Sequence, residues 1–499
     1  MSMGSSALAS LSETLALQRA SFQAEQPVTL AVRRDRLRRA IAMLLRHADR
    51  FIAASQADFG NRPPELARLT EVFFPLEALR HAERHVASWM KPDRRGALFP
   101  FSLFGARAEV QYQPLGVVGV VAPWNAALTL LFLPLAPILA AGNRAFLRPS
   151  DLTPHCAAAA AAAVSEYFDP AEVVVALGGH ETSVAFTSLP LDHLLFTGST
   201  AVGRSVARAA AEHLVPVTLE LGGKCPVFVL PDADLVDSAR KLAAGKLLNG
   251  GQACLGPDTA WVPPALIEPL LAAMDSELRR QLPQGVADAG VCGLFNARQY
   301  ERVAGLIDDA VARGAQLRVL GGGAARDAAR RVIAPTVLID PPPEARASLE
   351  EIFGPVMVLR TCPDLDGTLR ALRREDKPLG LYIFSRDSGA AQRVLDRSFS
   401  GGATLNDIAM HFAVHDLPFG GAGASGIGAY GSGLEGFRRF SHARAVYRQA
   451  GPFALTRAMR PPYGKLYQMV FVDGMKRLEK RYADVRSVRP VPPVNTEPR

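Results

Sequence analysis

Gly116-Val117-Val118-Gly119-Val120-Val121 is an unbroken apolar run, and it decides the fold class. A strand without polar positions is buried on both faces, which is typical of a parallel sheet covered by helices. The elements expected after it are a helix ending at Ala141, a strand at 144–147, an alanine-rich helix at 154–168, and strands at 173–176 and 191–196. This alternation predicts an α/β fold of the kind that binds nucleotides.

The chain continues on both sides of this region. Residues 11–91 have apolar positions at helical spacing and predict helices, and a Gly-, Pro- and Arg-rich connection follows at 92–104. It leads into a short alternating strand at 108–112, and a second α/β stretch runs over 226–405. At 499 residues the chain exceeds what one hydrophobic core supports, so more than one lobe is expected.

The five cysteines are Cys156, Cys225, Cys254, Cys292 and Cys362. Their number is odd, they are widely scattered, and they form no C-x-x-C pair, so neither a disulfide framework nor a metal site is expected. We expect free thiols and a cytoplasmic protein.

The hydropathy and charge patterns exclude two classes of protein. The most apolar run, 126–141, contains Pro134 and Pro137 and predicts a buried helix rather than a membrane span. The net charge of +8 is concentrated in residues 460–499, which hold nine Lys or Arg against four Asp or Glu. The rest of the chain is nearly neutral and gives little support for nucleic-acid binding.

Cys254 and Glu220 are the candidate catalytic pair. Each lies beside glycines, in Gly250-Gly251-Gln252-Ala253-Cys254 and Glu220-Leu221-Gly222-Gly223-Lys224, where a ligand can approach the backbone closely. A thiol and a carboxylate around one substrate suggest a nucleophile and a base. The alternative for any single cysteine is a small buried hydrophobe, and we expect that for the other four.

Several glycine motifs were candidates for phosphate binding. Gly198 to Gly203 follows an apolar strand and opens a helix, where backbone N–H groups favour a pyrophosphate, although a simple strand-to-helix turn is the alternative. The three overlapping G-x-G-x-x-G strings between Gly421 and Gly436 lack the required strand and helix context, and we interpret them as a loop. Cys225 stands where a P-loop needs Ser or Thr, which excludes an ATPase.

Two polar residues have both a functional and a structural interpretation. Asn125 follows a strand and is either an oxyanion donor or the N-cap of the next helix. Glu351, in Glu350-Glu351-Ile352-Phe353-Gly354-Pro355, taken alone is a surface helix end.

Taken together, these motifs resemble the aldehyde dehydrogenase superfamily over about residues 10 to 450. The resemblance rests on six segments in the family's order: 123–125, 196–199, 219–224, 252–254, 351–355 and 418–421. Further segments, such as Cys254-Leu255-Gly256-Pro257-Asp258 and Arg460-Pro461-Pro462-Tyr463-Gly464, look most like its coniferyl aldehyde dehydrogenase branch.

The resemblance implies a fold with three parts and a tail. It implies a Rossmann-like cofactor domain, an α/β catalytic domain, a small bridging element that pairs subunits in a homodimer, and a C-terminal tail. Their expected boundaries are 1–95 with 114–221, 222–424, 96–113 with 436–460, and 461–499.

It also implies the chemical roles. Cys254 would attack the aldehyde carbon, Asn125 would hold the oxyanion, and Glu220 would activate water to release the acid from a thioester. NAD would accept the hydride, with NADP possible. The residues expected at the cofactor are Pro123, Trp124, Arg148, Ser150, Asp151, Gly198, Ser199, Gly203, Leu221, Glu351 and Phe353.

The chain differs from the usual family sequence at two positions that the resemblance places at the adenosine ribose of the cofactor. The family usually has Lys and Glu where Arg148 and Asp151 stand. Arg148 could suit a 2′-phosphate, while Asp151 could accept a 2′-hydroxyl, so NAD is favoured slightly.

Two other classes of function compete with this interpretation. A cofactor-independent thiol hydrolase or acyltransferase would use Cys254, but it would leave Glu351 and the Gly198 turn without a task. A catalytically silent scaffold would not need the nucleophile, base and oxyanion donor that are present. The substrate expected is an aromatic (coniferyl-type) or a medium- or long-chain aliphatic aldehyde.

The tail contains a basic amphipathic helix at 465–482. Its apolar stripe consists of Tyr467, Val470, Phe471, Met475, Leu478 and Tyr482. We expect this stripe to dock on the protein's own body or its dimer partner, and covering the mouth of a substrate tunnel is a special case of that docking. Contact with an anionic membrane surface is the alternative.

Overall fold

The computed structural model describes residues 3–97, 101–449, 456 and 459–484. The chain forms two compact units, Met1–Lys91 with Tyr112–Ala443, and Pro92–Gln111 with Arg444–Arg499. The predicted bridging element and tail extend into residues 98–100, 450–455, 457–458 and 485–499, and to that extent lie outside the described residues.

The N-terminal segment is helical, as predicted. Its elements are α1 (Met3–Ala24), α2 (Leu30–Arg46), α3 (Ala48–Phe59), α4 (Pro64–Ala67), a π-helical turn (Arg68–Phe73) and α5 (Phe74–Trp89). Thr29 caps α2, because its hydroxyl accepts a hydrogen bond from the Val32 N–H. Leu37 and Leu44, two of the apolar positions at helical spacing, are buried in α2.

A six-stranded sheet confirms the parallel α/β architecture and positions the site. Its order is β17-β7-β6-β3-β4-β5, and all neighbours are parallel except β17, which is antiparallel to β7. The strands are β3 (Val117–Val121), β4 (Arg144–Arg148), β5 (Val173–Val175), β6 (His193–Thr197), β7 (Val217–Glu220) and β17 (Gly426–Ile427). The chain runs outward from β3 to β5 and then returns to β6 on the other side of β3. The strand order therefore reverses between β3 and β6, where ligands bind in such sheets.

The helices that connect these strands are α6 (Thr129–Phe132), α7 (Leu135–Ala141), α8 (Pro154–Tyr167), α9 (His180–Thr187) and α10 (Thr200–Ala211). The prediction of a single helix ending at Ala141 is wrong in one respect. The structure has two helices there, α6 and α7, which are separated at Leu133 and Pro134. Proline removes a backbone donor and favours such a break. Both pieces are buried, and no helix among the described residues is long and apolar enough to cross a membrane.

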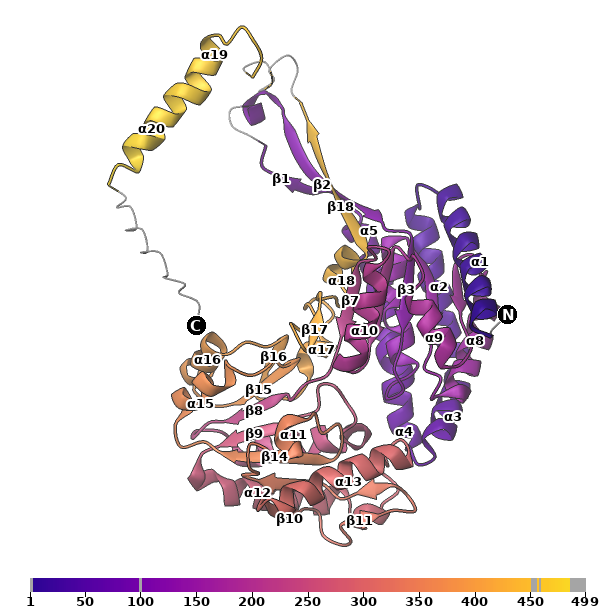
Figure 1. The fold of residues 1–499 in the computed structure, drawn as a ribbon, viewed down its shortest axis with the longest axis vertical. Helices are drawn as coiled ribbons and strands as arrows, with labels where there is room; N and C mark the ends of the chain where they lie inside the picture. The colour runs from indigo at the N-terminus through magenta and orange to yellow at the C-terminus, as the bar shows by residue number, and fades with distance from the viewer. Residues whose placement is uncertain (1–2, 98–100, 450–455, 457–458, 485–499) are drawn as a thin grey trace, which may run out of the picture. The chain divides into compact units, whose positions relative to one another are not determined.

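A second sheet holds the nucleophile loop. Its order is β10-β13-β14-β9-β8-β15-β16, and β10 is its antiparallel strand (Figure 1). The strands are β8 (Pro226–Val229), β9 (Thr259–Val262), β10 (Gln316–Val319), β13 (Thr336–Ile339), β14 (Val356–Thr361), β15 (Gly380–Phe384) and β16 (Gly402–Leu405). The helices are α11 (Leu235–Leu247), α12 (Ile267–Gln281), α13 (Ala297–Ala312), α14 (Arg346–Leu349), α15 (Leu365–Leu372), α16 (Ser388–Arg397), α17 (Met410–Ala413) and α18 (Leu434–Arg439).

The second unit contains most of a three-stranded sheet and the tail helix. The sheet has the order β1-β2-β18, with β1 (Asp93–Arg95), β2 (Arg107–Pro114) and β18 (Ser441–Arg448). The tail helix is confirmed as α19 (Lys465–Tyr467) and α20 (Asp473–Arg481), joined by a π-helical stretch (Gln468–Val472).

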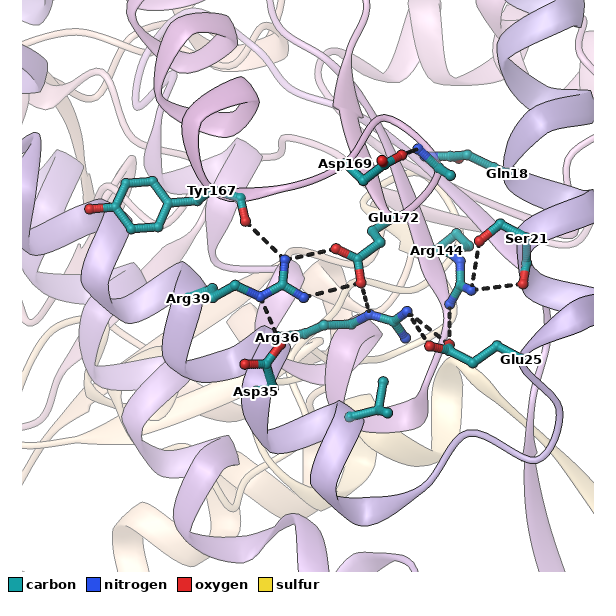
Figure 2. Close-up of polar contacts among 12 residues, drawn as sticks. Gln18, Ser21, Glu25, Asp35, Arg36, Arg39, Arg144, Tyr167, Asp169 and Glu172 are labelled. Atoms are coloured by element: carbon teal, nitrogen blue, oxygen red, sulfur yellow. Dashed lines mark hydrogen bonds and ion pairs between the residues drawn. The ribbon is translucent and has the colours of Figure 1, made fainter.

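An ionic network fastens α1 and α2 to the edge of the six-stranded sheet (Figure 2). The guanidinium of Arg36, 1% exposed, donates to both oxygens of Glu25 and to Glu172 at 2.8–3.0 Å. Arg144 on β4 donates to the same Glu25 carboxylate at 2.9 Å, and Arg39 donates to Glu172 at 2.7 Å. Because each carboxylate serves two arginines, the network acts as one unit.

Replacing Arg36 by alanine is expected to lower the free energy of unfolding by about 3 kcal/mol, because two largely enclosed carboxylates lose a shared partner. Arg38→Ala on the same helix is the matched control. The Arg38 side chain is 67% exposed, so its pair with Glu83 contributes less than about 1 kcal/mol. Urea denaturation measures both variants, and equal losses would contradict the role of the network.

Candidate functional site

A cavity of about 240 Å³ lies at the carboxyl ends of β3, β6 and β7. It is lined by Pro123, Trp124, Asn125, Leu130, Thr197, Gly198, Ser199, Glu220, Leu221, Gly222, Cys254, Gln299, Arg302, Glu351 and Phe353. The structure therefore brings together most of the site residues predicted from the sequence, including the thiol, the carboxylate and the carboxamide. Arg148, Ser150, Asp151 and Gly203 do not line this cavity.

The loop that carries Cys254 is held in a tight, left-handed turn. Asn249 and Gly250 have φ values of 53° and 61°, which a non-glycine residue adopts at a cost. The Gln252 side chain fixes the turn, because its amide donates to the carbonyls of Asn249 (2.8 Å) and Gly293 (3.1 Å). Its oxygen accepts from the Phe295 N–H at 2.8 Å, so Cys254 is presented from a rigid loop.

Asn125, in the segment between β3 and α6, is hydrogen-bonded to the nucleophile loop and is not a helix cap. Helix α6 begins at Thr129 with Leu128 as its N-cap, so the N-cap alternative is wrong. The Asn125 Nδ2 donates to the Gln252 carbonyl at 3.1 Å, and Asn249 donates to the Asn125 backbone carbonyl at 2.9 Å. A primary amide has two N–H groups, which leaves a second one for a ligand.

Glu220, the last residue of β7, is buried and chemically unusual. Among the described residues neither of its carboxylate oxygens has a hydrogen-bond partner. Burial raises its pKa well above the ordinary 4.5, although the charge of Arg439 opposes this. A buried carboxyl with free acceptor capacity and a raised pKa is typical of a general base or acid.

Cys254 is the one cysteine that is not fully buried, as predicted. All five cysteines are free in the structure. Burial, together with the charges of Glu351 and Glu220, raises the pKa of the Cys254 thiol to about 12. The protein alone therefore holds a protonated thiol at neutral pH.

Glu351 lies in a loop that is fixed from two sides. Arg302 donates to the backbone carbonyl of Ile352 at 2.7 Å, and the Ile352 N–H donates to Asp258 at 2.9 Å. Phe353 has a φ of 46°, and strain of this kind is kept where the surroundings enforce it. Glu351 itself lines the cavity, and burial and the charge of Asp258 raise its pKa to about 7.

The Gly198 turn opens α10 toward the cavity. Ser199 is the N-cap of this helix, and its hydroxyl accepts from the Val202 N–H at 3.5 Å. Gly203 has a packing role, because a Cβ there would come within 2.6 Å of the Leu221 side chain. Gly198 and Ser199, at the N-terminus of α10, line the cavity, and the N-terminus of a helix suits a phosphate.

Several lining residues were not predicted from the sequence. Gln299 and Arg302 come from the amphipathic helix α13, whose spacing carries no sign of a site. For Gly222 the sequence did contain an indication of a role in the site, because this residue lies in the pair of glycines after Leu221. A Cβ at Gly222 would approach Glu351 Oε2 within 1.9 Å, so glycine is required for this contact.

Comparisons with known proteins agree with this geometry. The model of the aldehyde dehydrogenase family matches residues 6–446. A coniferyl aldehyde dehydrogenase from Pseudomonas sp. (strain HR199 / DSM 7063) is 41% identical over 441 residues, which cover 88% of this chain and 91% of that protein. A dimeric NADP-preferring aldehyde dehydrogenase from Rattus norvegicus is 33% identical, covering 88% and 94%.

The structure of Staphylococcus aureus AldH in a substrate-bound state superimposes with a TM-score of 0.85 at 32% identity, covering 92% of this chain and 98% of that one. The family model spans most of the chain and the relatives match over nearly their whole length. The chain therefore belongs to the aldehyde dehydrogenase family, and it oxidises an aldehyde with NAD or NADP as the hydride acceptor.

Proposed function

We propose that Cys254 is the nucleophile, Asn125 the oxyanion donor and Glu220 the base of this reaction. The observation that carries the proposal is their convergence on one cavity, in which the carboxylate has unused acceptor capacity. The Cys254 thiol loses its proton to solvent, and Sγ attacks the aldehyde carbon as the thiolate to form a thiohemiacetal oxyanion. The developing oxyanion accepts hydrogen bonds from the second Asn125 N–H and from the backbone N–H of Cys254.

The residues around the cavity fit a nicotinamide dinucleotide. The N-terminus of α10 suits its pyrophosphate, and the Glu351 carboxylate suits a ribose diol. Pro123, Trp124, Leu221 and Phe353 supply apolar surface for the nicotinamide end. When bound, the cofactor supplies the hydride acceptor, and loss of the hydride leaves a thioester on Cys254.

Glu220 then completes the cycle. Its carboxylate takes a proton from a water molecule, which attacks the thioester carbonyl and releases the carboxylic acid and the Cys254 thiolate. The same water-derived oxygen ends in the product acid. Because the carboxyl is buried, its pKa lies well above the ordinary 4.5.

We propose an aromatic aldehyde of the coniferyl type as the preferred substrate. A second cavity is lined by Phe74, Phe412, Phe419 and Tyr430, with Phe412 and Phe419 in T-shaped contact at 5.1 Å. Its lining residue Tyr430 lies close enough to Glu220 for the carboxylate charge to add to the effect of burial in raising the pKa of the tyrosine. These side chains favour an aromatic ring near them, but the cavity of about 20 Å³ is too small to hold one without movement of its walls. The name of the Pseudomonas relative is the observation that supports this substrate class.

The test is cofactor reduction with a panel of coniferyl aldehyde, benzaldehyde and an aliphatic series. The proposal predicts the highest kcat/KM for the aromatic members. A preference for long aliphatic chains would leave the family activity intact and contradict the substrate class.

The assembly and the location of the protein are further parts of the proposal. We propose a cytoplasmic homodimer with the bridging element 96–113 and 436–460 between subunits, supported by the dimeric Rattus norvegicus relative. The cofactor domain 1–95 with 114–221 and the catalytic domain 222–424 would each contain one of the two larger sheets. The tail 461–499 exposes Met475 and Leu478, and docking on the body or partner of the same protein would cover them.

Cofactor affinity is expected to depend on pH through Glu351. Its pKa of about 7 means that the carboxylate, the stronger acceptor for a ribose hydroxyl, predominates above neutral pH and is lost as the pH falls through 7. The Kd for NAD⁺ should therefore rise several-fold between about pH 8.5 and pH 6. Quenching of tryptophan fluorescence measures it, because Trp124 lines the cavity. In Glu351→Gln this pH dependence of the Kd should disappear. If it persists in that variant, a group other than Glu351 causes it.

A further inference from the structure

A cation near Glu220 has no part in the catalytic steps proposed so far. Arg439 is a half-buried residue of α18, and its guanidinium is bonded to β7, the strand that ends at Glu220. Its Nε donates to the Thr218 hydroxyl at 2.8 Å, and its Nη2 donates to the Val217 carbonyl at 2.6 Å. Thr218 and Glu220 are two positions apart on the strand, so their side chains leave the same face. Arg439 is therefore anchored on the side of β7 from which Glu220 projects.

Glycine backbone brings the two groups close together. Gly428 has a φ of 77° and packs against the guanidinium, because a Cβ there would be 2.2 Å from Arg439 Nη2. The Gly428 carbonyl and Glu220 Oε1 both lie within 3.1 Å of the position that a Cβ on Gly420 would take. Gly426, two residues before Gly428, pairs directly with Glu220 across β17 and β7. The guanidinium and the carboxylate thus both lie close to the backbone of Gly428.

Arg439 and Glu220 interact through their charges rather than through a hydrogen bond. Glu220 is 4% exposed, and among the described residues neither of its carboxylate oxygens has a hydrogen-bond partner. Burial raises the pKa of Glu220, and the charge of Arg439 opposes this rise. In turn, burial lowers the pKa of Arg439, and the charge of Glu220 opposes that fall. Charges at a buried site interact strongly without direct contact, because the local dielectric constant is low.

The other titratable groups around this pair leave Arg439 as its fixed charge. Burial, with the charge of Arg439, lowers the pKa of His193 to about 3, so this ring is neutral at physiological pH. Burial raises the pKa of Tyr430 well above its ordinary value, so its hydroxyl is also neutral. In the thioester, Cys254 Sγ carries the acyl group and cannot ionise. Glu351 lines the same cavity and has a pKa of about 7, so its titration has to be separated from that of the base by substitution.

We propose that Arg439 is a positioning residue for the release of the acid: it holds the end of β7 and supplies the positive charge that favours ionised Glu220 while water attacks the thioester. This inference rests on the proposed role of Glu220 as the base. The proton balance of the step is unchanged, since the Glu220 carboxylate takes the proton from water and Arg439 keeps its own.

Arg439→Gln should move the ascending limb of the pH profile of steady-state turnover to higher pH. Without the positive charge Glu220 is more easily protonated, so the midpoint should rise by about one pH unit. Turnover on the acid side should fall several-fold, while the plateau at high pH is kept. The adjacent Arg438, whose Nη1 donates to Glu435 at 3.0 Å, provides the matched control. Arg438→Gln removes the same charge and should leave the midpoint unchanged.

Arg439→Lys separates the charge from the packing. Lysine keeps the positive charge but cannot reproduce the two-pronged contact with Thr218 and Val217. Resistance to urea should therefore fall, whereas the midpoint should stay close to that of the wild type. A purely structural role would instead lower the rate of Arg439→Gln equally at all pH values. That result, or a midpoint that moves as far in the lysine variant as in the glutamine variant, would overturn the proposal.

A direct titration of Glu220 covers a change of the rate-limiting step. Infrared difference spectra at stepped pH detect the band of a buried protonated carboxyl, which is assigned by its absence in Glu220→Gln. Its midpoint should rise in Arg439→Gln and not in Arg438→Gln, and equal midpoints in these two variants would overturn the proposal. Thr218→Val removes the acceptor of the Arg439 Nε and should give a smaller rise. It replaces Arg439→Gln if that variant does not fold, and an unchanged midpoint would then overturn the proposal.

Failure of the proposed function gives a different result. If the ascending limb of turnover persists in Glu220→Gln, Glu220 is not the base, and the role of Arg439 falls with it. If the limb disappears in Glu220→Gln but does not move in Arg439→Gln, the base is correct and only the inference about Arg439 is wrong.

Discussion

Cys254→Ala is expected to lose aldehyde-dependent formation of NADH or NADPH by on the order of 10⁴-fold or more, because without the thiol no covalent intermediate forms. The remaining parts of the cavity do not depend on Sγ, since the loop is held by the hydrogen bonds of Gln252 and Asn249. Cofactor binding, followed by tryptophan fluorescence, should therefore be retained. The rate is measured from the absorbance of the reduced cofactor.

Cys362→Ala is the matched control for this variant. Cys362 is also a free cysteine, but it is buried beside Thr368, with Sγ 3.2 Å from the Thr368 hydroxyl and no part in the cavity. It should oxidise aldehydes at a rate close to that of the wild type. Substantial turnover by Cys254→Ala would show that the nucleophile is a different group.

Glu220→Gln is expected to oxidise about one equivalent of aldehyde and then nearly stop. The amide cannot take a proton from water, so the thioester accumulates and steady-state turnover falls by roughly 10²- to 10⁴-fold. Stopped-flow absorbance should show a burst of reduced cofactor equal to the enzyme concentration. Absence of the burst would mean that Glu220 acts before the thioester forms, as the acceptor of the Cys254 proton.

The pH profile provides a second readout for the same residue. Burial raises the pKa of Glu220 well above 4.5, and the residue acts as a base when ionised. Steady-state turnover in the wild type should therefore increase as the pH rises through this raised pKa, and decrease as the pH falls below it. In Glu220→Gln that ascending limb should be missing.

Much of the fold was predictable because its signals are local. The strand at Val117–Val121 has no polar residue, and burial on both faces allows little else than a central parallel strand. The break between α6 and α7 is absent from the prediction, because the apolar run 126–141 indicates one continuous helix. In the structure that helix is interrupted at Pro134. The exact path of a buried helix depends on packing against neighbours, which hydropathy does not contain.

The site residues also fall into two groups, those that the sequence predicts and those that it does not. Cys254, Glu220 and Asn125 lie in short glycine-flanked segments whose residue types reveal their chemistry. The orientation of Arg148 could not be predicted, because its partners at Ala176 to Gly179 are about thirty residues away and are backbone carbonyls of no particular sequence. Arg302 was missed for a related reason, since it acts through the backbone carbonyl of Ile352.

The most direct test of the central claim is to trap the covalent intermediate. Glu220→Gln is mixed with cofactor and an aromatic aldehyde, quenched in acid and analysed by mass spectrometry after digestion. The account predicts the mass of one acyl group on the peptide that contains Cys254, in a yield that matches the burst. A burst without an adduct on that peptide, or an adduct on another cysteine, would contradict the thioester at Cys254.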